Sequence, residues 1–271
     1  MFKNFLPRFG IKVHFVDVQN IDAVNALINE RTKVVYCESI SNPLLDVSDI
    51  PALAAICKPR GVKLVVDNTF SPMMLSPIRL GADVVVHSLT KYINGTSDCV
   101  AGAVCASSEF IHQLTDINSG ASMLFGAVLD STRAASILKN LHSRHLRMRQ
   151  HSQNAQYVAE NLQKLGLRVF YPGLPEHPQH RLLTDMMNAG YGYGGMLAVD
   201  VGDTAKANRL MTRMQEEKVG YLAVSLGYFK TLFSAPGHST SSEIPIEERE
   251  AMGLSEGLVR FSVGLDNDIE L

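Results

Sequence analysis

Short, continuous runs of apolar residues alternate with amphipathic stretches through the first half of the chain. Amphipathic stretches at 20–31 and 46–61 predict helices, the first begun by Asn20 or Asp22 and the second ended by Gly61. The strand-like runs show little polar alternation, so both faces of each strand are expected to be buried. This pattern is typical of an α/β fold with a largely parallel sheet under helices. The predicted strands are 12–18, 33–39, 62–68, 82–88 and 99–107.

The second half of the chain starts with a long helical region. It covers about 125–165 and is expected to break near its middle. Strand-like runs separated by helices such as 204–217 follow it. This change of pattern predicts a large domain at 1–142 and a smaller C-terminal α/β domain at 143–271. The strands predicted in the second domain are 168–174, 194–202, 218–227 and 257–265.

Composition narrows the class of protein. The chain has 271 residues, 46% of them hydrophobic, which is ample for a buried core. Its formal net charge of -2 gives no reason to expect a nucleic-acid or membrane partner. No apolar run is long enough to span a membrane and the N-terminal residues lack a secretory pattern, so we expect a cytoplasmic protein. The four cysteines form no C-x-x-C pair and are expected to be buried free thiols.

A lysine beside two hydroxyl residues follows one of the predicted buried strands. Burying Lys91 as a cation is costly, so its amine must be solvated, paired or deprotonated for a purpose. A Schiff-base lysine needs a desolvated site, and a phosphate-bearing cofactor needs donors such as Ser88 and Thr90 nearby. Asp67 ends the preceding strand and could keep a pyridinium nitrogen protonated. A solvated Lys91 and a turn-capping Asp67 are the alternatives.

Ligands of parallel sheets bind at the carboxyl ends of the strands. Asp67, Ser88 and Lys91 all fall at or just beyond such ends, and Glu38 and Asn42 follow the end of another strand. The sequence therefore predicts one site at this edge of the sheet.

Four strings carry a resemblance to a known family. They are ESISNP at 38–43, VVDNTFSP at 65–72, GADVVVHSLTKYING at 81–95 and SEGLVRFSVGLDN at 255–267. The chain resembles, in this order and over essentially its whole length, the Cys/Met metabolism family of enzymes that depend on pyridoxal 5'-phosphate (PLP). The resemblance implies the aspartate aminotransferase-like fold of type I PLP enzymes, with residues 1–142 as the PLP-binding domain. It also implies a homotetramer built as a dimer of dimers.

The resemblance assigns the cofactor-binding residues. Lys91 is implied as the Schiff-base lysine, whose freed amine then moves protons between the substrate and the cofactor. Asp67 is implied as the partner of the pyridine nitrogen, and Ser88 and Thr90 as phosphate contacts. Asn42 is implied near the phenolic oxygen of the cofactor and near the substrate.

The resemblance also assigns the substrate-binding residues. Arg260 is implied as the clamp of the substrate carboxylate, a task suited to a planar, bidentate guanidinium. Ser225 is implied as a second contact to that carboxylate. Glu38 lies in the same motif as Asn42 without a definite role. The alternative for Arg260 is a surface charge on an amphipathic strand.

The implied reaction is cleavage of a C–S bond in a sulfur amino acid. We expect γ-elimination of methionine or cystathionine to 2-oxobutanoate, ammonia and a thiol. The alternatives are a cystathionine β-lyase, or a γ-replacement enzyme such as a cystathionine γ-synthase or an O-acylhomoserine sulfhydrylase. A non-catalytic remnant is a further alternative, because family members usually extend further at both ends. Their N-terminal part supplies a phosphate-binding loop, a tyrosine stacked on the cofactor and a Tyr-x-Arg contact to the neighbouring subunit.

Three other signals receive simpler interpretations. The glycines at 190–195 match a dinucleotide-binding pattern by letter, but a strand follows them, so we expect a flexible turn. The histidines and arginines at 142–151 are expected to form a solvated basic helix face and not a metal site. The segment at 233–245 departs from the Met-Thr-His of many family members, which leaves the substrate side chain unassigned.

Overall fold

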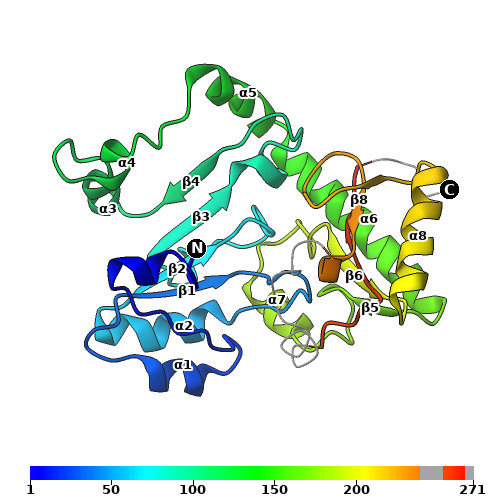
Figure 1. Ribbon diagram of the computed structural model, residues 1–271, viewed down its shortest axis with the longest axis horizontal. Helices are drawn as coiled ribbons and strands as arrows, with labels where there is room; N and C mark the ends of the chain where they lie inside the picture. Colours follow the sequence, from blue (N-terminus) through cyan, green and yellow to red (C-terminus); the bar gives the residue numbers. More distant parts are fainter. Residues whose placement is uncertain (239–252, 266–271) are drawn as a thin grey trace.

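Two β-sheets, each packed against helices, lie side by side in the structure (Figure 1). The structure is a computed structural model that describes residues 1–238 and 253–265. Most of the segment 233–245 therefore lies outside the described residues. The first sheet has the order β1-β2-β3-β4, with β1 (Val34–Glu38), β2 (Lys63–Asp67), β3 (Val84–Ser88) and β4 (Gly102–Cys105). The second has the order β5-β6-β9-β8-β7, with β5 (Arg168–Phe170), β6 (Met196–Asp200), β7 (Tyr221–Leu222), β8 (Leu232–Ser234) and β9 (Leu258–Ser262).

The first sheet has the parallel arrangement that its apolar runs predicted. β1, β2 and β3 are parallel, and only β4 is antiparallel to its neighbour. Glu38 lies opposite Asp67, and Asp67 lies opposite Val86. The carboxyl ends of these three strands therefore meet at one edge. The predicted strand at 12–18 is wrong: these residues are mostly exposed, have no strand conformation and pair with no strand among the described residues.

Two helices on this first half begin and end where their capping residues predict. In α1 (Ile21–Leu27), the Asn20 side chain accepts a hydrogen bond of 3.0 Å from the Ala23 N–H. α2 (Ile50–Cys57) continues into a short 3₁₀ turn that ends at Gly61, whose φ of 65° suits a residue without a Cβ.

The long helical region is broken, as predicted. α3 (Ser108–Thr115) and α4 (Ala121–Leu124) precede α5 (Ser131–Leu141), and α6 (Arg144–Lys164) starts after a two-residue break. α7 (His180–Met186) and α8 (Thr204–Glu216) follow. Sequence reasoning missed α7 and β8, because both are too short to show a clear period. The glycines at 190–195 lie in turns, as expected.

Alternation along β9 gives the second sheet two different faces. Val259, Phe261 and Val263 pack in one core cluster with residues of α6 and α8. Leu258 and Arg260 point to the opposite face because successive strand residues alternate. On that face Leu258 clusters with Leu44 of the first half, so the face is turned toward the first sheet.

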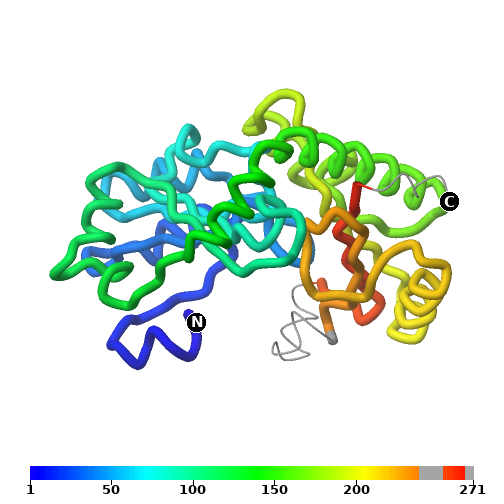
Figure 2. The backbone as a smooth tube through the Cα atoms, turned by 90° about the horizontal axis from the view of Figure 1, so that it is seen from above, coloured from blue at the N-terminus to red at the C-terminus, as the bar shows by residue number. Residues whose placement is uncertain are grey.

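The packing is continuous between the two sheets. α6 runs from the first half to the second (Figures 1 and 2), with Met148 in the first core cluster and Ala155 in the second. Leu183 and Leu226 also join the first cluster. All four strands of the first sheet precede residue 143 and all five of the second follow it. The domain boundary at 143 stays a prediction.

Three of the four cysteines are buried free thiols, as expected. They are Cys37, Cys57 and Cys99. Cys105 is also free but is exposed, because its strand lies at the edge of the first sheet. No helix in the described part of the chain is both long and apolar enough to cross a bilayer.

Candidate active site between the two sheets

Lys91 lies in a tight turn directly after β3. Residues Leu89–Ile93 form one π-helical turn, and the backbone of Lys91 itself departs from helical geometry with φ −91° and ψ −133°. The turn closes where the Gly95 N–H donates to the Lys91 carbonyl at 2.8 Å. The lysine is therefore presented by a short, hydrogen-bonded loop at the carboxyl edge of the first sheet.

The amine of Lys91 is held by a residue of the second half. Its Nζ donates to the Ser225 Oγ over 3.0 Å, and the side chain is half-buried. Burial lowers the pKa of Lys91, and the nearby Arg260 cation lowers it further. A larger share of the amine is therefore neutral near pH 7 than for a surface lysine, which suits a nucleophile or a base.

Arg260 is a buried cation in the central strand of the second sheet. Its side chain is 2% exposed, which excludes the alternative of a surface charge. Nη1 donates to the Asn42 Oδ1 at 3.0 Å, and Nη2 donates to the Val224 and Ser225 carbonyls at 3.0 and 3.3 Å. Its Nε is buried and has no hydrogen-bond partner among the described residues, and burial lowers the pKa of the guanidinium.

Two cations, Lys91 and Arg260, thus both contact Ser225. Within the described residues, Arg260 forms no ion pair with a carboxylate. A buried, unpaired charge is expensive, and a second cation beside it adds repulsion. The arrangement favours an anionic ligand next to Arg260 and Lys91.

The acids lie on the other side, at the ends of β1 and β2. The Asp67 carboxylate accepts from the Thr69 N–H at 2.9 Å and from the Tyr36 hydroxyl at 3.1 Å. A Glu38 oxygen accepts from the Asn42 N–H at 3.2 Å. Desolvation by burial, and then the Asp67 charge, raises the pKa of Glu38 to about 7. Near neutral pH Glu38 is therefore only partly ionised.

The two predicted phosphate contacts are held by different partners. The Ser88 N–H donates to the Thr69 Oγ1 at 2.8 Å, which ties the ends of β2 and β3 together. The Thr90 Oγ1 accepts from the Ala101 N–H at 3.0 Å and lies 3.4 Å from the Ala101 carbonyl. The Thr90 hydroxyl is thus already engaged by the neighbouring backbone. The phosphate-binding role of Ser88 and Thr90 stays a prediction.

Thr69 was missed as a site residue although it stands in the quoted string VVDNTFSP. Its N–H contacts Asp67 and its hydroxyl contacts Ser88, so it joins two predicted residues. The signal that could have found it is its position, two residues beyond the acid at a strand end, where a turn N–H can reach back to the carboxylate.

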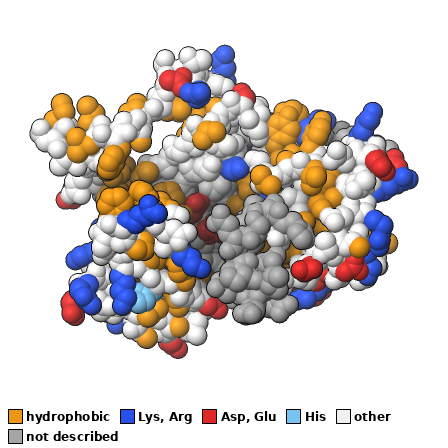
Figure 3. Space-filling view, in the orientation of Figure 1, with side chains coloured by type: hydrophobic (Ala, Val, Ile, Leu, Met, Phe, Trp, Pro, Cys, Tyr) orange, Lys and Arg blue, Asp and Glu red, His pale blue; other side chains and the backbone are white. Residues whose placement is uncertain are grey.

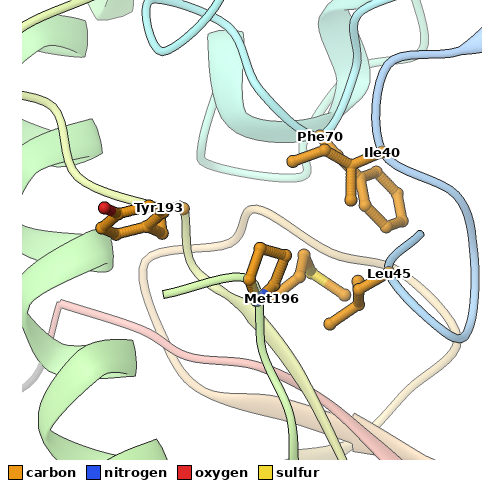
Figure 4. A pocket seen from close by; sticks show the side chains of 7 residues that line it. Ile40, Leu45, Phe70, Tyr193 and Met196 are labelled. Atoms are coloured by element: carbon orange, nitrogen blue, oxygen red, sulfur yellow. The ribbon is translucent and has the colours of Figure 1, made fainter. Parts of the chain in front are cut away.

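The described residues leave a hollow between the two halves of the molecule (Figure 3). Figure 3 shows acidic side chains in the hollow between the two halves. A separate small cavity of about 10 Å³ lies between Ile40 and Phe70 on one side and Tyr193 and Met196 on the other (Figure 4). Its lining is mostly apolar and its volume is enough for about one water molecule. It contains none of the predicted site residues.

The prediction of a solvated helix face at 142–151 is wrong in part. Arg147 is half-buried and hydrogen-bonded, and His151 is fully buried against the ring of Tyr92. The signal was helical spacing: Met148, Ser152 and Ala155 recur on the same face of α6 and are all buried. In the described part of the chain no cluster of potential metal ligands exists.

Comparison with known proteins now identifies the family. The profile described as Cys/Met metabolism PLP-dependent enzyme matches residues 1–271. The chain belongs to this family. Among curated relatives, the methionine gamma-lyase of Arabidopsis thaliana is 47% identical over 273 residues, covering 100% of this chain and 62% of the relative. The cystathionine beta-lyase of Lactococcus lactis subsp. cremoris is 39% identical, covering 96% of this chain and 67% of the relative. The chain therefore spans about two thirds or less of these relatives.

A solved structure supports the same assignment at the level of the fold. The cystathionine gamma-lyase of Lactobacillus plantarum, complexed with L-serine, superimposes with a TM-score of 0.88 at 28% identity. The match covers 98% of this chain and 68% of the other. The predicted family and the α/β fold of the type I PLP enzymes are thus confirmed.

The side chains of the hollow fit the cofactor on which the family depends. A partly buried amine, Lys91, and a hydrogen-bonded carboxylate, Asp67, lie on neighbouring strand ends of one sheet. Arg260 adds a buried cation, one N–H of which has no partner in the described part of the chain, and such a cation suits a carboxylate of the substrate. The chemistry of this donor set matches an aldehyde, a ring nitrogen and an amino-acid carboxylate in turn.

Proposed function

We propose that this chain belongs to a PLP-dependent C–S lyase that acts on sulfur amino acids. The favoured reaction is γ-elimination of methionine or cystathionine to 2-oxobutanoate, ammonia and a thiol. The observation that carries the proposal is the contact between the Lys91 amine and Ser225, beside the buried Arg260, which forms no ion pair with a carboxylate of the described residues. The name of the Arabidopsis thaliana relative, a methionine gamma-lyase, supports the choice of substrate.

Lys91 and Arg260 divide the work on the substrate. Arg260 binds the substrate carboxylate, and its own contacts to Asn42 and the Val224 carbonyl fix the plane of the guanidinium. Lys91, with its lowered pKa, takes the proton from the substrate Cα and can return it to another atom. When bound, the cofactor supplies an electron sink through its ring.

Asp67 is proposed to hold the cofactor from the side opposite to Lys91, and Asn42 to lie near the phenolic oxygen, beside the aldehyde carbon. Asp67 would face the ring nitrogen, and a carboxylate can accept the Tyr36 and Thr69 hydrogen bonds and still have lone pairs left. Asn42 is linked to Glu38 through its backbone and to Arg260 through its side chain, so it joins the cofactor side to the substrate side. Ser88 and Thr90 are proposed for the phosphate.

A second candidate is β-elimination. This reaction is supported by the Lactococcus lactis relative, which is named a cystathionine beta-lyase and is 39% identical to this chain.

We further propose that the whole protein is a cytoplasmic homotetramer, as the family resemblance implies. Size-exclusion chromatography with light scattering tests the assembly.

A product assay tests the proposed function. The protein is loaded with PLP and then incubated in separate reactions with methionine, cystathionine or an O-acylhomoserine. The products are identified by mass spectrometry. We expect 2-oxobutanoate. Pyruvate would indicate β-elimination. A new thioether formed from the O-acylhomoserine and added cysteine, or a thiol amino acid formed with added sulfide, would indicate γ-replacement. No product with any substrate, from a preparation that binds PLP, would contradict the proposal.

A Lys91 variant provides the matched test of the site. Lys91→Ala should abolish borohydride-fixed attachment of PLP and reduce turnover by about 10²–10⁴-fold, as expected on loss of a catalytic acid–base group. The control is Lys164→Ala, which alters an exposed lysine at the end of α6. Intact-mass measurement after borohydride treatment gives the first readout. Fixation that persists in Lys91→Ala would exclude Lys91 as the attachment residue.

A further inference from the structure

Arg147 on α6 contacts the backbone of the turn that carries Lys91. Its Nη1 donates to the Tyr92 carbonyl at 2.6 Å, and its Nη2 donates to the Ile93 carbonyl at 2.9 Å. These carbonyls belong to the two residues that directly follow the lysine. Since the guanidinium is planar, two contacts through different nitrogens fix both the position and the orientation of this backbone segment.

The Arg147 guanidinium is itself held by neighbouring groups. Its Nε donates to the Ser143 Oγ at 3.1 Å, and Nη2 also donates to the Asn140 carbonyl at 3.1 Å. The side chain is half-buried, and burial lowers its pKa, followed by the effect of the Arg144 charge. Within the described residues no carboxylate pairs with it. A desolvated cation is thus used on backbone carbonyls.

The end of the turn is shaped to receive this side chain. Gly95 has φ 77°, and a Cβ at this position would overlap the Arg147 guanidinium. The Asn140 side chain donates to the Asn94 Oδ1 at 2.8 Å, so the end of α5 supports the same turn. The junction of α5 and α6 therefore contacts the backbone of the turn, while Ser225 accepts a hydrogen bond from the lysine amine.

We propose that Arg147 is a positioning residue for Lys91: by binding the Tyr92 and Ile93 carbonyls it fixes the direction in which the lysine leaves its turn. The proposal rests on the proposed function of Lys91 for its meaning in catalysis. Arg147 touches neither the amine nor any other predicted site residue. The pKa of Lys91 is lowered by burial and by the Arg260 charge; the charge of Arg147 is not among these causes.

This separation gives a readout that a purely structural role would not change. If Arg147 sets the burial of Lys91, its removal lets water reach the amine, and the pKa of Lys91 rises toward the ordinary value of a lysine. The pKa is measured on the full chain without cofactor, from the pH dependence of acetylation of Lys91 followed by peptide mass spectrometry. The result does not depend on any lyase activity, so it separates this proposal from the proposed function.

The two test variants differ in what they keep. Arg147→Met keeps an aliphatic side chain of similar length, and Arg147→Lys keeps the positive charge but loses the planar guanidinium with its two Nη donors. The control is Arg149→Met, which alters an exposed arginine on the same helix. We expect the acetylation midpoint of Lys91 to shift upward in Arg147→Met, less far in Arg147→Lys, and not in the control. Trapping of added PLP on Lys91 by borohydride should need about tenfold more cofactor in Arg147→Met.

An unchanged midpoint in folded Arg147→Met, judged by circular dichroism, would overturn the proposal and leave Arg147 a purely stabilising residue. If Arg147→Met does not fold, Arg147→Lys decides on the same terms. An upward shift then supports the proposal, and an unchanged midpoint overturns it.

Discussion

The two sheets of this chain position charged side chains in different ways, the acids Glu38 and Asp67 on the first sheet and the cation Arg260 on the second. The first sheet places Glu38 and Asp67 at the carboxyl ends of parallel strands, where turn N–H groups and hydroxyls can reach them. The second sheet places Arg260 in the middle of its central strand, with Ala198 and Ser234 opposite it on the neighbouring strands. An acid at a strand end depends on local turns, whereas an arginine inside a strand depends on the register of a whole sheet.

This difference shows what each charge requires of the fold. The acids keep contact with solvent or with nearby donors, so small movements of their turns are tolerated. Arg260 is desolvated and is held by Asn42 from the other half of the chain, so its orientation is fixed only when both sheets are in place. Arg260 therefore couples ligand binding to the junction of the two halves.

Replacing Arg260 should have the largest effect on this arrangement. Arg260→Lys keeps the charge but places all its donors on one nitrogen, so it loses the planar guanidinium whose separate nitrogens contact Asn42 and the Val224 carbonyl. Loss of one charge-assisted contact of about 3 kcal/mol predicts roughly a 10²-fold fall in kcat/KM for the amino-acid substrate. Steady-state kinetics measure it, with borohydride-fixed PLP as evidence that Lys91 still reacts.

The matched control is Arg168→Lys, which changes a largely exposed arginine on β5 of the same sheet. Its kcat/KM should stay within about twofold, because surface ion pairs contribute little. An Arg260→Lys protein with unaltered KM and kcat would mean that the buried guanidinium serves the fold and not the substrate.

Breaking the bridge between the two halves at His151 should have the next largest effect. The imidazole contacts the Tyr92 ring at a centroid distance of 5.1 Å, and its Nδ1 lies 2.7 Å from the Val263 carbonyl. Burial lowers the pKa of His151 to about 4. Because the unfolded chain takes up this proton near pH 6.5 and the folded chain does not, the stability it provides is lost as pH falls from about 6.5 to 4.

The size of this loss is about 3 kcal/mol at most. Urea unfolding at pH 7 and pH 4.5 measures it in the natural chain and in His151→Gln, which cannot take up the proton. The natural chain should lose more stability on acidification than the variant does. Equal losses in the two proteins would show that His151 remains accessible to protons in the folded state.

The site residues that could be predicted from the sequence alone differ between the two sheets. Asp67 and Lys91 could be found from strand ends, because an apolar run that stops at a charged residue marks the edge of a parallel sheet. The burial of Arg260 could not be found in this way, since the same alternation along β9 also suits a solvent-facing arginine. The family resemblance alone pointed to Arg260, and the structure supplies its partners.

The packing of α6 shows a second limit. The polar letters around Arg147 and His151 favour a solvated face, and their burial depends on a turn that is more than fifty residues away in sequence. A helix period can show which residues share a face, but not what that face meets. That residues 12–18 pair with no strand of the described chain could not be foreseen for the same reason.

Ser225→Ala should sharpen the comparison with a smaller effect. The variant removes the acceptor of the Lys91 amine but leaves the Val224 and Ser225 carbonyls that hold Arg260. Loss of one hydrogen bond to a charged group, about 1.5 kcal/mol, predicts roughly a tenfold fall in kcat/KM. Stability should change little, as in the control Ser122→Ala, a partly buried serine on α4. A fall in stability without a kinetic effect would contradict this role of the hydroxyl.

The acid pair of the first sheet should show the smallest effect, and with a sign opposite to that of His151. Burial, and then the Asp67 charge, raises the pKa of Glu38 to about 7. Between about pH 4.5 and 7 the folded chain therefore holds a proton that the unfolded chain releases, so this group makes the protein less stable as pH rises through that window. Because the Glu38 side chain is partly exposed, solvent screening limits the effect to roughly 1 kcal/mol.

Urea unfolding at pH 5.5 and pH 8 should show this loss in the natural chain but not in Glu38→Gln. If Glu38→Gln loses as much stability on going to pH 8, the carboxyl is already ionised at pH 5.5 and the two acids do not share the edge of the sheet as closely as their register suggests.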